Sequence, residues 1–253
     1  MVRLEDNKFL TKYRQIENPP VPARVYIPLS QHLGKICQPL VNIGDCVLKG
    51  RKIAGVEAHI QAPIHSSVSG KVAAITEHAH PVLGRCKSIV IESDSLDKLG
   101  PASTRTTEDI DKLTPDNIRQ IIFEAGIVGM GGAGFPTHLK LNPPKPVHTL
   151  IVNAMECEPY LTADYRIMIE KANEILRGIA LAARCLGVKS IYLAIEDNKF
   201  EAVKRFKAFH PQLKIKVLKS AYPQGGEKQL IKDILGKEVG RSKLPFDLGV
   251  VVQ

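Results

Sequence analysis

A glycine-rich segment in the middle of the chain has the composition of a loop that holds a phosphate or a flat ring. It reads GMGGAGFPTHLK over residues 129–140. Glycines lack a Cβ, so backbone N–H groups can approach a ligand closely, and Lys140 can place a positive charge beside it. A mobile loop without a ligand is the alternative. The candidate binding residues are Gly129, Gly131, Gly132, Gly134, Phe135 and Lys140.

The spacing of Gly129, Gly131 and Gly134 also satisfies the pattern GxGxxG. In a dinucleotide fingerprint, that pattern follows a strand and opens a helix. Here a helix is predicted before the glycines instead. The pattern alone therefore identifies no nucleotide site, although the bare backbone still favours close approach of a ligand.

A second polar segment, NAMECEPY over residues 153–160, directly follows a predicted buried strand. Polar groups at the carboxyl end of a parallel strand lie where α/β sheets bind ligands. Glu156 and Glu158 would point the same way if the chain were extended. The two carboxylates could accept hydrogen bonds from ribose hydroxyls or a nicotinamide amide. A solvated acidic turn is the alternative.

The third segment, YPQGGEKQ over residues 222–229, follows a later predicted strand and opens a helix. Gly225 and Gly226 at a helix N-terminus favour anion binding, and Glu227 can bind a ribose edge. A simple strand–helix turn is the alternative. The candidate residues are Tyr222, Gly225, Gly226 and Glu227.

Cysteines and histidines give no sign of a metal site or of a nucleophile. The five cysteines are odd in number, and none is spaced as CxxC, so no disulfide framework, zinc site or iron–sulfur site is predicted. Cys157 is interpreted as positional because no base can be paired with it. His59 and His65 are interpreted as turn or surface histidines, with metal binding as the less favoured alternative.

The second half of the chain, residues 114–253, alternates helices and strands. Such alternation predicts βαβ crossovers and a largely parallel sheet, typical of a nucleotide-binding α/β domain. Thr114 is the predicted cap of the first helix, and Gly187 closes the longest one. The predicted helices span 115–125, 162–186, 199–209 and 227–235, and the predicted strands span 149–153, 190–195, 214–218 and 248–252.

The first half is different, with short apolar runs separated by glycine turns over residues 25–95. This density of short strands predicts a small β-barrel or sandwich. Residues 1–24 form an N-terminal extension, and the polar residues 96–113 are predicted to be a linker.

Composition excludes several classes of protein. The chain has 253 residues, of which 44% are hydrophobic and 24% charged, so disorder, collagen and coiled coil are excluded. No signal peptide or apolar run of membrane-spanning length is present. The net charge of +9 is spread along the chain without a nucleic-acid motif, so no nucleic-acid partner is predicted.

The barrel-like half resembles the biotinyl/lipoyl-like hammerhead fold, on the residues NIGDCVLKG (42–50) and APIHSSVSGKV (62–72). Carrier versions of that fold present a modified lysine at a hairpin tip. The corresponding stretch here, HIQAPIH over residues 59–65, has no lysine. The resemblance therefore implies a structural or docking domain without a prosthetic group.

Taken together, GMGGAGFPTHLK, NAMECEPYLTADYR and YPQGGEKQL are similar to the flavin- and NADH-binding module of the C subunit of the Rnf ferredoxin:NAD oxidoreductase and of the NADH-oxidising subunit of respiratory complex I. The match to the Rnf C subunit is closer, includes IPLSQHLG (27–34), and covers nearly the whole chain. It implies a barrel-sandwich hybrid domain followed by a Rossmann-like, mostly parallel FMN/NADH-binding domain over residues 114–253.

The resemblance also implies an oxidoreductase subunit that passes electrons between NAD(H) and iron–sulfur centres. Non-covalent FMN would lie on the glycine loop, and hydride transfer would occur at flavin N5 without a catalytic side chain. Asn153, Glu156 and Glu158 would lie near the flavin–nicotinamide contact, and Tyr222, Gly225, Gly226 and Glu227 would bind the nucleotide. Other Rnf subunits and, indirectly, ferredoxin are the implied partners, at the cytoplasmic face of the membrane, with peripheral attachment.

Two departures from the Rnf pattern leave alternatives open. Residues 1–12 lack the Gly-Gly-His-Pro-like opening, and the cysteine runs that bind [4Fe-4S] clusters are absent, so we expect a C-terminally truncated piece of a longer protein. Related subunits of soluble systems, a cobalamin reductase or a proline-reductase-associated electron-transfer protein, are alternatives. A non-catalytic docking scaffold is a further one.

Overall fold

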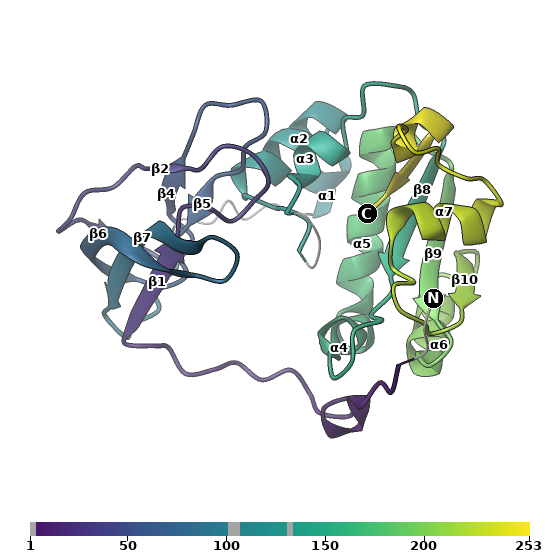
Figure 1. Cartoon of the computed structure of the whole chain (residues 1–253), viewed down its shortest axis with the longest axis horizontal. Coiled ribbons are helices and arrows are strands. Elements are labelled where there is room, and N and C mark those ends of the chain that lie inside the picture. Colours follow the sequence, from purple (N-terminus) through teal and green to yellow (C-terminus); the bar gives the residue numbers. More distant parts are fainter. Residues whose placement is uncertain (1–3, 101–106, 131–133) are drawn as a thin grey trace. The chain divides into compact units, whose positions relative to one another are not determined.

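The computed structural model describes residues 4–100, 107–130 and 134–253 (Figure 1). The chain forms two compact units. One unit contains residues 18–140, and the other combines residues 1–17 with 141–253. The predicted boundary near residue 113 therefore differs from the structural one, because the helices and glycine segment that precede residue 141 belong with the β-rich half.

The β-rich unit is built from two antiparallel sheets. The larger sheet has the order β1-β7-β6-β3, and the smaller has the order β2-β4-β5. A register shift between Val72 and Ala74 bends the long β6–β7 pair. The predicted short-strand half is thus confirmed, with two brief strands added. The strands are β1 (Arg24–Pro28), β2 (Gln38–Pro39), β3 (Cys46–Val47), β4 (Lys52–Gly55), β5 (Ile64–His65), β6 (Gly70–His80) and β7 (Gly84–Ser93).

The core of this unit is small and aliphatic. Leu29, Ile53, Ile89 and Ile91 are almost fully buried and belong to one cluster. β-branched side chains pack well on a pleated surface and are stiff, which favours these strands over helices. The barrel therefore has a core of its own, as an independent domain requires.

The described parts of residues 95–113, on both sides of residues 101–106, contain more structure than the linker that the sequence predicts. The Gly100 N–H donates to the Lys49 carbonyl at 2.9 Å, and Leu99 bridges Lys49 in a parallel pairing. Residues 101–106 lie outside the described part. The helix α1 (Thr107–Asp111) then begins within the predicted linker. A polar, Ser/Thr-rich composition hid both the pairing and the helix.

The helix α2 (Pro115–Glu124) forms as predicted. Thr114 Oγ1 accepts from the Asn117 N–H at 3.2 Å, Asn117 Oδ1 accepts from the Thr114 N–H at 3.3 Å, and proline opens the helix. After the glycine segment comes the short helix α3 (Thr137–Lys140).

The α/β unit contains a sheet of four strands, all parallel, in the order β10-β9-β8-β11. The predicted parallel sheet is confirmed. β8 is central, and its two neighbours are β9, the next strand in the sequence, and β11, the last one. The strands are β8 (Thr149–Ala154), β9 (Ser190–Glu196), β10 (Lys214–Leu218) and β11 (Val250–Val252).

Helices cover both faces of this sheet. Leu230 and Ile231 of α7 (Glu227–Leu235) pack with Ile151 on one face. Phe206 of α6 (Phe200–Phe209) packs with Leu193 on the opposite face, since alternate residues of a strand face opposite sides. Both faces of the central strands are therefore buried, which is why they read as continuous apolar runs.

The long helix predicted over residues 162–186 is in fact two helices. They are α4 (Ala163–Glu170) and α5 (Ala172–Leu186). Lys171 separates them with φ −124° and ψ 27°, outside the helical region. No glycine or proline marks this break, and the apolar stripe continues across it from Tyr165 to Ala172. The prediction of one helix was wrong because the sequence pattern carries no signal for the break.

The N-terminal residues 4–17 pack on the α/β unit, although they precede the barrel in the sequence. They contain the short 3-10 helix η1 (Lys8–Leu10). The Tyr160 N–H donates to the Asp6 carbonyl at 2.8 Å, and Thr11 and Thr162 hydroxyls lie 2.8 Å apart. In the part of the chain that the structure describes, no helix has both the length and the apolar character needed to cross a membrane.

Candidate functional site

Asn153 ties together two of the three predicted segments at the carboxyl edge of the parallel sheet. Its Nδ2 donates to the Gly225 carbonyl at 3.0 Å, and its Oδ1 accepts from the Met155 N–H at 3.2 Å. The side chain is exposed. From β8 the chain continues to β9 and β10 on one side and later returns to β11 on the other side, so the strand order reverses at β8. Open α/β sheets bind ligands at the carboxyl edge beside such a reversal.

A buried side-chain amide, that of Gln224, stabilises the turn that precedes α7. Gln224 is buried, and its Nε2 donates to Asp233 Oδ2 at 2.5 Å. Gly226 caps α7 without a side-chain hydrogen bond, and Glu227 lies in the first turn. Tyr222, at the start of the same turn, is about half exposed. The predicted glycines thus present backbone at the start of a helix, beside Asn153.

Glu156 lies inside the protein, not at the edge of the sheet. Its carboxylate accepts from Lys199 Nζ at 2.8 Å and from the Asp164 N–H at 2.8 Å. It also lies 3.4 Å from Lys8 Nζ and from the Tyr165 N. The carboxylate therefore caps the start of α4, a position that favours negative charge.

Four buried charges surround this point, two of each sign. They are Lys8, Glu156, Glu196 and Lys199, and none is more than 3% exposed. Glu196 Oε2 accepts from the Glu156 N–H at 3.1 Å and lies 3.6 Å from Lys199 Nζ. Burial, followed by the nearby Lys199 ammonium, lowers the pKa of Lys8, and the two carboxylates oppose that shift. Balanced and fully hydrogen-bonded charges are tolerated in a protein interior.

Glu158, two residues along, has the opposite environment. Its side chain is exposed, while its carbonyl accepts from Lys8 Nζ at 3.0 Å. The expectation that Glu156 and Glu158 point the same way fails because β8 ends at Ala154 and the chain turns. Tyr160 in that turn has φ +65°, a conformation unusual for a bulky residue.

The glycine segment closes a loop in the β-rich unit. The Gly129 N–H donates to the Phe135 carbonyl at 3.0 Å, and Val128 bridges Pro136. Met130 is 93% exposed. Gly131 and Gly132 lie outside the described residues. Lys140 ends α3 and is partly exposed.

Gly134 is where the barrel contacts this loop. It has φ +65°, and a Cβ there would lie 3.1 Å from His32 Cα. Its carbonyl accepts from the Leu33 N–H at 3.0 Å. His32 in turn accepts from the Ala62 N–H through Nε2 at 3.1 Å, so its Nδ1–H donates to the Leu33 carbonyl. Residues 31–34 therefore contact the glycine segment at Gly134; the sequence named them only as part of the matching segment IPLSQHLG and assigned them no role.

Two polar atoms directly after the glycines have no partner among the described residues. They are Thr137 Oγ1 and His138 Nδ1, and both are buried. Desolvation lowers the pKa of His138, whose ring meets Phe123 edge-on at 4.9 Å. Buried polar atoms normally have a hydrogen-bond partner. Both residues lie within the glycine motif, and this position was the only sign of a role in the sequence, but neither was predicted to be a site residue.

These features fit a phosphate-bearing, flat cofactor. A hydroxyl and an imidazole nitrogen with unused hydrogen-bonding capacity lie just after Gly134, whose own Cβ position faces the backbone of residues 31–33. A phosphate oxygen accepts from donors of both kinds. The residues present are therefore compatible with the FMN that the sequence predicts.

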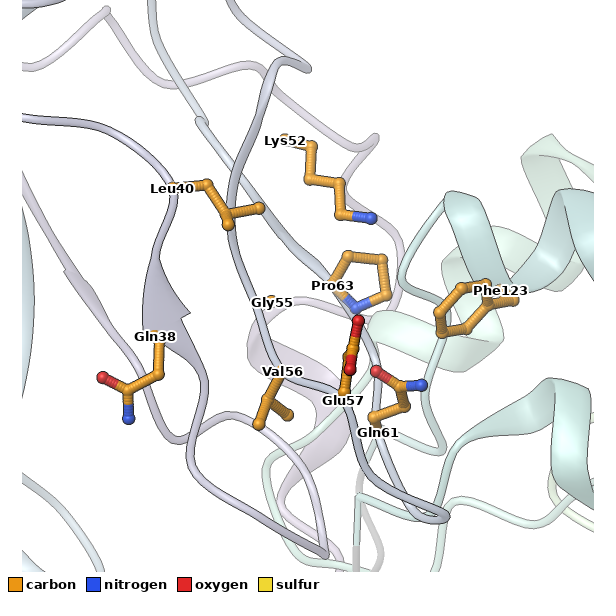
Figure 2. A pocket seen from close by; sticks show the side chains of 9 residues that line it. All are labelled: Gln38, Leu40, Lys52, Gly55, Val56, Glu57, Gln61, Pro63 and Phe123. Atoms are coloured by element: carbon orange, nitrogen blue, oxygen red, sulfur yellow. The ribbon is translucent and has the colours of Figure 1, made fainter.

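An open pocket of about 490 Å³ lies elsewhere on the β-rich unit. Figure 2 shows Lys52 and Phe123 at one side of it; Lys52 Nζ lies 5.8 Å from the Phe123 ring centre and 3.5 Å from Glu124 Oε2. In the described part of the chain, none of the lining residues belongs to the three motif segments. The lining residues are Gln38, Leu40, Lys52, Gly55, Val56, Glu57, Gln61, Pro63 and Phe123.

Histidines and cysteines do not gather into a metal site in residues 4–100, 107–130 and 134–253. His65 is partly buried, and its ring lies 3.2 Å from where a Cβ on Gly126 would be, just beyond α2. All five cysteines are free, and Cys157 is partly exposed. His65 thus packs within its own unit.

Sequence comparison assigns both halves of the chain. Residues 2–96 match the RnfC barrel sandwich hybrid domain. Residues 122–253, about half of the chain, match the Nuo51 FMN-binding domain. The chain belongs to the Nuo51 FMN-binding domain family. All three motif segments lie within the matched range, so the resemblance on which they were selected is confirmed, as is the two-domain α/β layout.

Relatives of this FMN-binding-domain protein are C subunits of ion-translocating complexes. The one from the proton-translocating ferredoxin:NAD(+) oxidoreductase complex of Clostridium ljungdahlii is 43% identical, covering 100% of this chain and 56% of that protein. Its counterpart in the Na(+)-translocating complex of Acetobacterium woodii is 44% identical over 91% and 53%. The corresponding protein of the ion-translocating oxidoreductase complex of Rhodobacter capsulatus is 42% identical over 98% and 49%.

The chain spans about half the length of these curated relatives. Among solved structures, an NAD+-reducing [NiFe]-hydrogenase in its air-oxidized state is 30% identical, with a TM-score of 0.46. That match covers 55% of this chain and 28% of the hydrogenase chain.

Proposed function

We propose that this chain is the FMN- and NADH-binding part of an electron-transfer protein like the C subunit of the Rnf complex. The observation that carries the proposal is the match of residues 122–253 to the Nuo51 FMN-binding domain, since it contains every motif residue selected from the sequence. The names of the relatives, ferredoxin:NAD(+) oxidoreductase complex subunits, support the same activity.

We propose a Rossmann-like α/β unit. The strand order β10-β9-β8-β11 corresponds to the third, second, first and fourth strands of the unit. This is the order of the first four strands in the doubly wound dinucleotide fold, in which ligands bind where the order reverses. The reversal here falls between β8 and β11, at the strand that ends in Asn153 and Ala154.

FMN is assigned to the glycine segment, where Gly129, Gly131, Gly132, Gly134, Phe135 and Lys140 are the proposed contacts. Thr137 and His138 join them because their buried polar atoms lack partners in the described structure. When bound, FMN supplies the ability to take up a hydride and release electrons singly. The protein residues bind and orient the cofactor, and none acts as acid or base.

The nucleotide is assigned to the sheet edge, with Asn153, Glu158, Tyr222, Gly225, Gly226 and Glu227 as proposed contacts. The exposed carboxylate of Glu158 offers a charge-assisted acceptor for ribose hydroxyls or the nicotinamide amide. Glu156 acts differently: its buried carboxylate holds Lys8 and Lys199 and fixes the turn that presents Glu158. Its contribution to binding is therefore indirect.

The remaining length of the relatives is the proposed place of the [4Fe-4S] centres that receive or deliver electrons. Other subunits of the complex, and ferredoxin indirectly, are the proposed partners at the cytoplasmic face of the membrane. The relatives' names as complex subunits support this assignment.

Flavin binding by the purified chain tests the proposal. FMN should bind stoichiometrically, and its absorbance should bleach when NADH is added without oxygen. Titration with NADPH under the same conditions measures nucleotide preference. If the folded chain binds neither FMN nor NADH, the electron-transfer proposal fails and a docking role for the barrel takes its place.

A further inference from the structure

The ammonium of Lys8 occupies a cage of backbone carbonyls at the proposed nucleotide edge. Its Nζ donates to the Glu156 carbonyl at 2.7 Å, to the Glu158 carbonyl at 3.0 Å and to the Leu161 carbonyl. The Glu156 carboxylate lies 3.4 Å away. The side chain is 4% exposed. One cation from the N-terminal segment thus binds both ends of the turn 156–161.

The same turn contains a residue in an unfavourable backbone conformation. Tyr160 has φ +65° although it is not a glycine, and its N–H donates to the Asp6 carbonyl at 2.8 Å. Such a conformation persists only when the surroundings impose it. Asp6 holds the turn at Tyr160, and Lys8 holds the carbonyls before and after it.

In the described structure, no group within residues 156–161 makes the hydrogen bonds that Asp6 and Lys8 make to this turn. The carbonyls of Glu158 and Leu161 point at the same ammonium, and electrostatic attraction overcomes the repulsion between their dipoles. The only exposed carboxylate of this turn, Glu158, is therefore presented at an angle that Lys8 sets.

We propose that Lys8 is a positioning residue for nucleotide binding. Its ammonium group binds carbonyls of the 156–161 turn as a bound monovalent cation would, fixes the conformation of the turn and so places Glu158. This inference rests on the proposed function only where it names the nucleotide. It makes the N-terminal segment part of the site, although that segment is separated from the turn by the whole barrel in sequence.

Truncation followed by chemical rescue tests this role in the full chain loaded with FMN. Lys8→Ala removes three carbons and the ammonium, which are the atoms of n-propylammonium. NADH affinity should fall about tenfold, as expected from losing hydrogen bonds to a charged group. Added n-propylammonium should restore the affinity, while tetramethylammonium, which has the same charge but no N–H donor, should not.

Lys12→Ala is the matched control, because Lys12 lies in the same segment but donates to the Asn198 carbonyl at 3.3 Å, outside the turn. Its NADH affinity should stay at the wild-type value. Unchanged affinity in Lys8→Ala, or equal rescue by tetramethylammonium, would overturn the inference.

Hydrogen exchange at the Tyr160 amide gives a readout that needs no nucleotide. Exchange should accelerate in Lys8→Ala and slow again with n-propylammonium. Should the wild type bind no NADH, the proposed function fails while this measurement still decides the role of Lys8. If Lys8→Ala does not fold, Lys8→Met replaces it, because methionine keeps the length of the buried side chain. Hydrogen exchange of the Tyr160 amide at the wild-type rate in Lys8→Met would contradict the proposal.

Discussion

Glu156 and Glu158 are the same residue type two positions apart, yet they have different environments and different roles in the structure. Glu156 is sealed among Lys8, Lys199 and the start of α4, and Glu158 faces solvent. The sequence predicts that carboxylates gather after β8, because the motif is local. It does not predict which one is buried, because the partners that decide this lie 148 and 43 residues away.

Glu156→Gln and Glu158→Gln should therefore separate stability from binding. The Glu156 change leaves two buried ammonium groups with one carboxylate, which should lower the free energy of unfolding by about 3–5 kcal/mol. The Glu158 change is at an exposed site and should cost no more than about 0.5 kcal/mol. It should instead weaken NADH binding, since a charge-assisted acceptor is lost. Urea unfolding and NADH titration of each variant measure the two effects. Equal destabilisation by both would contradict the burial argument.

Two partly buried histidines predict how the β-rich unit responds to acid. Desolvation lowers the pKa of His65 and of His138. Below the unfolded-state pKa of about 6.5, the unfolded chain therefore binds protons that the folded unit does not. Its stability should fall as the pH drops from about 7 through this window.

His138→Asn tests this acid response, because asparagine does not titrate. Urea unfolding of the β-rich unit at neutral and mildly acidic pH should show a shallower loss of stability in the variant. A slope identical to the wild type would mean that His138 titrates normally in the folded chain.

At the scale of elements, a loop of the barrel directly contacts the glycine segment. Residues 31–34 contact Gly134 through a backbone hydrogen bond and by close packing on His32. The Gly134 φ of +65° disfavours any side chain, and the 3.1 Å approach of a Cβ to His32 Cα would require the 31–34 loop to give way by a few tenths of an ångström.

Gly134→Ala should thus displace the 31–34 loop and weaken FMN binding. Gly84→Ala is the matched control, since Gly84 has φ +72° in the same unit but open space around its Cβ position. Backbone strain alone should cost each variant about 1–2 kcal/mol. The excess in Gly134→Ala, and its loss of FMN affinity by absorbance titration, measure the contact with His32. Identical behaviour of the two variants would leave the barrel loop without a role at the glycines.

The elements themselves were predicted well where the signal is local. The bounds of α7 agree with the prediction, and Thr114 caps α2 as the sequence indicates. The break at Lys171 and the pairing of Leu99 with Lys49 were missed. Both depend on tertiary contacts that leave hydrophobic periodicity and composition unchanged.

At the scale of the molecule, order in the sequence and membership of a unit diverge. Residues 1–17 belong with residues 141–253, and the barrel is inserted between them. Lys8 shows why: a buried ion network is satisfied only when the N-terminal segment lies on the α/β unit. Sequence patterns distinguished a β-rich half from an α/β half, but they placed the boundary near residue 113 instead of residue 140 and assigned the first residues to neither half. One lysine in a polar segment gives no signal of burial.

This division predicts that the chain unfolds in two steps, because each unit has its own hydrophobic core. Hydrogen-exchange mass spectrometry at increasing urea should give one midpoint for peptides within residues 24–93 and another for peptides within 149–252. Lys8→Met leaves Glu156 without one partner and should lower only the second midpoint, by about 3–5 kcal/mol in unfolding free energy. Gly134→Ala should lower only the first. If either variant shifts both midpoints equally, the two units unfold as one, and the N-terminal lysine stabilises the whole chain instead of the α/β unit alone.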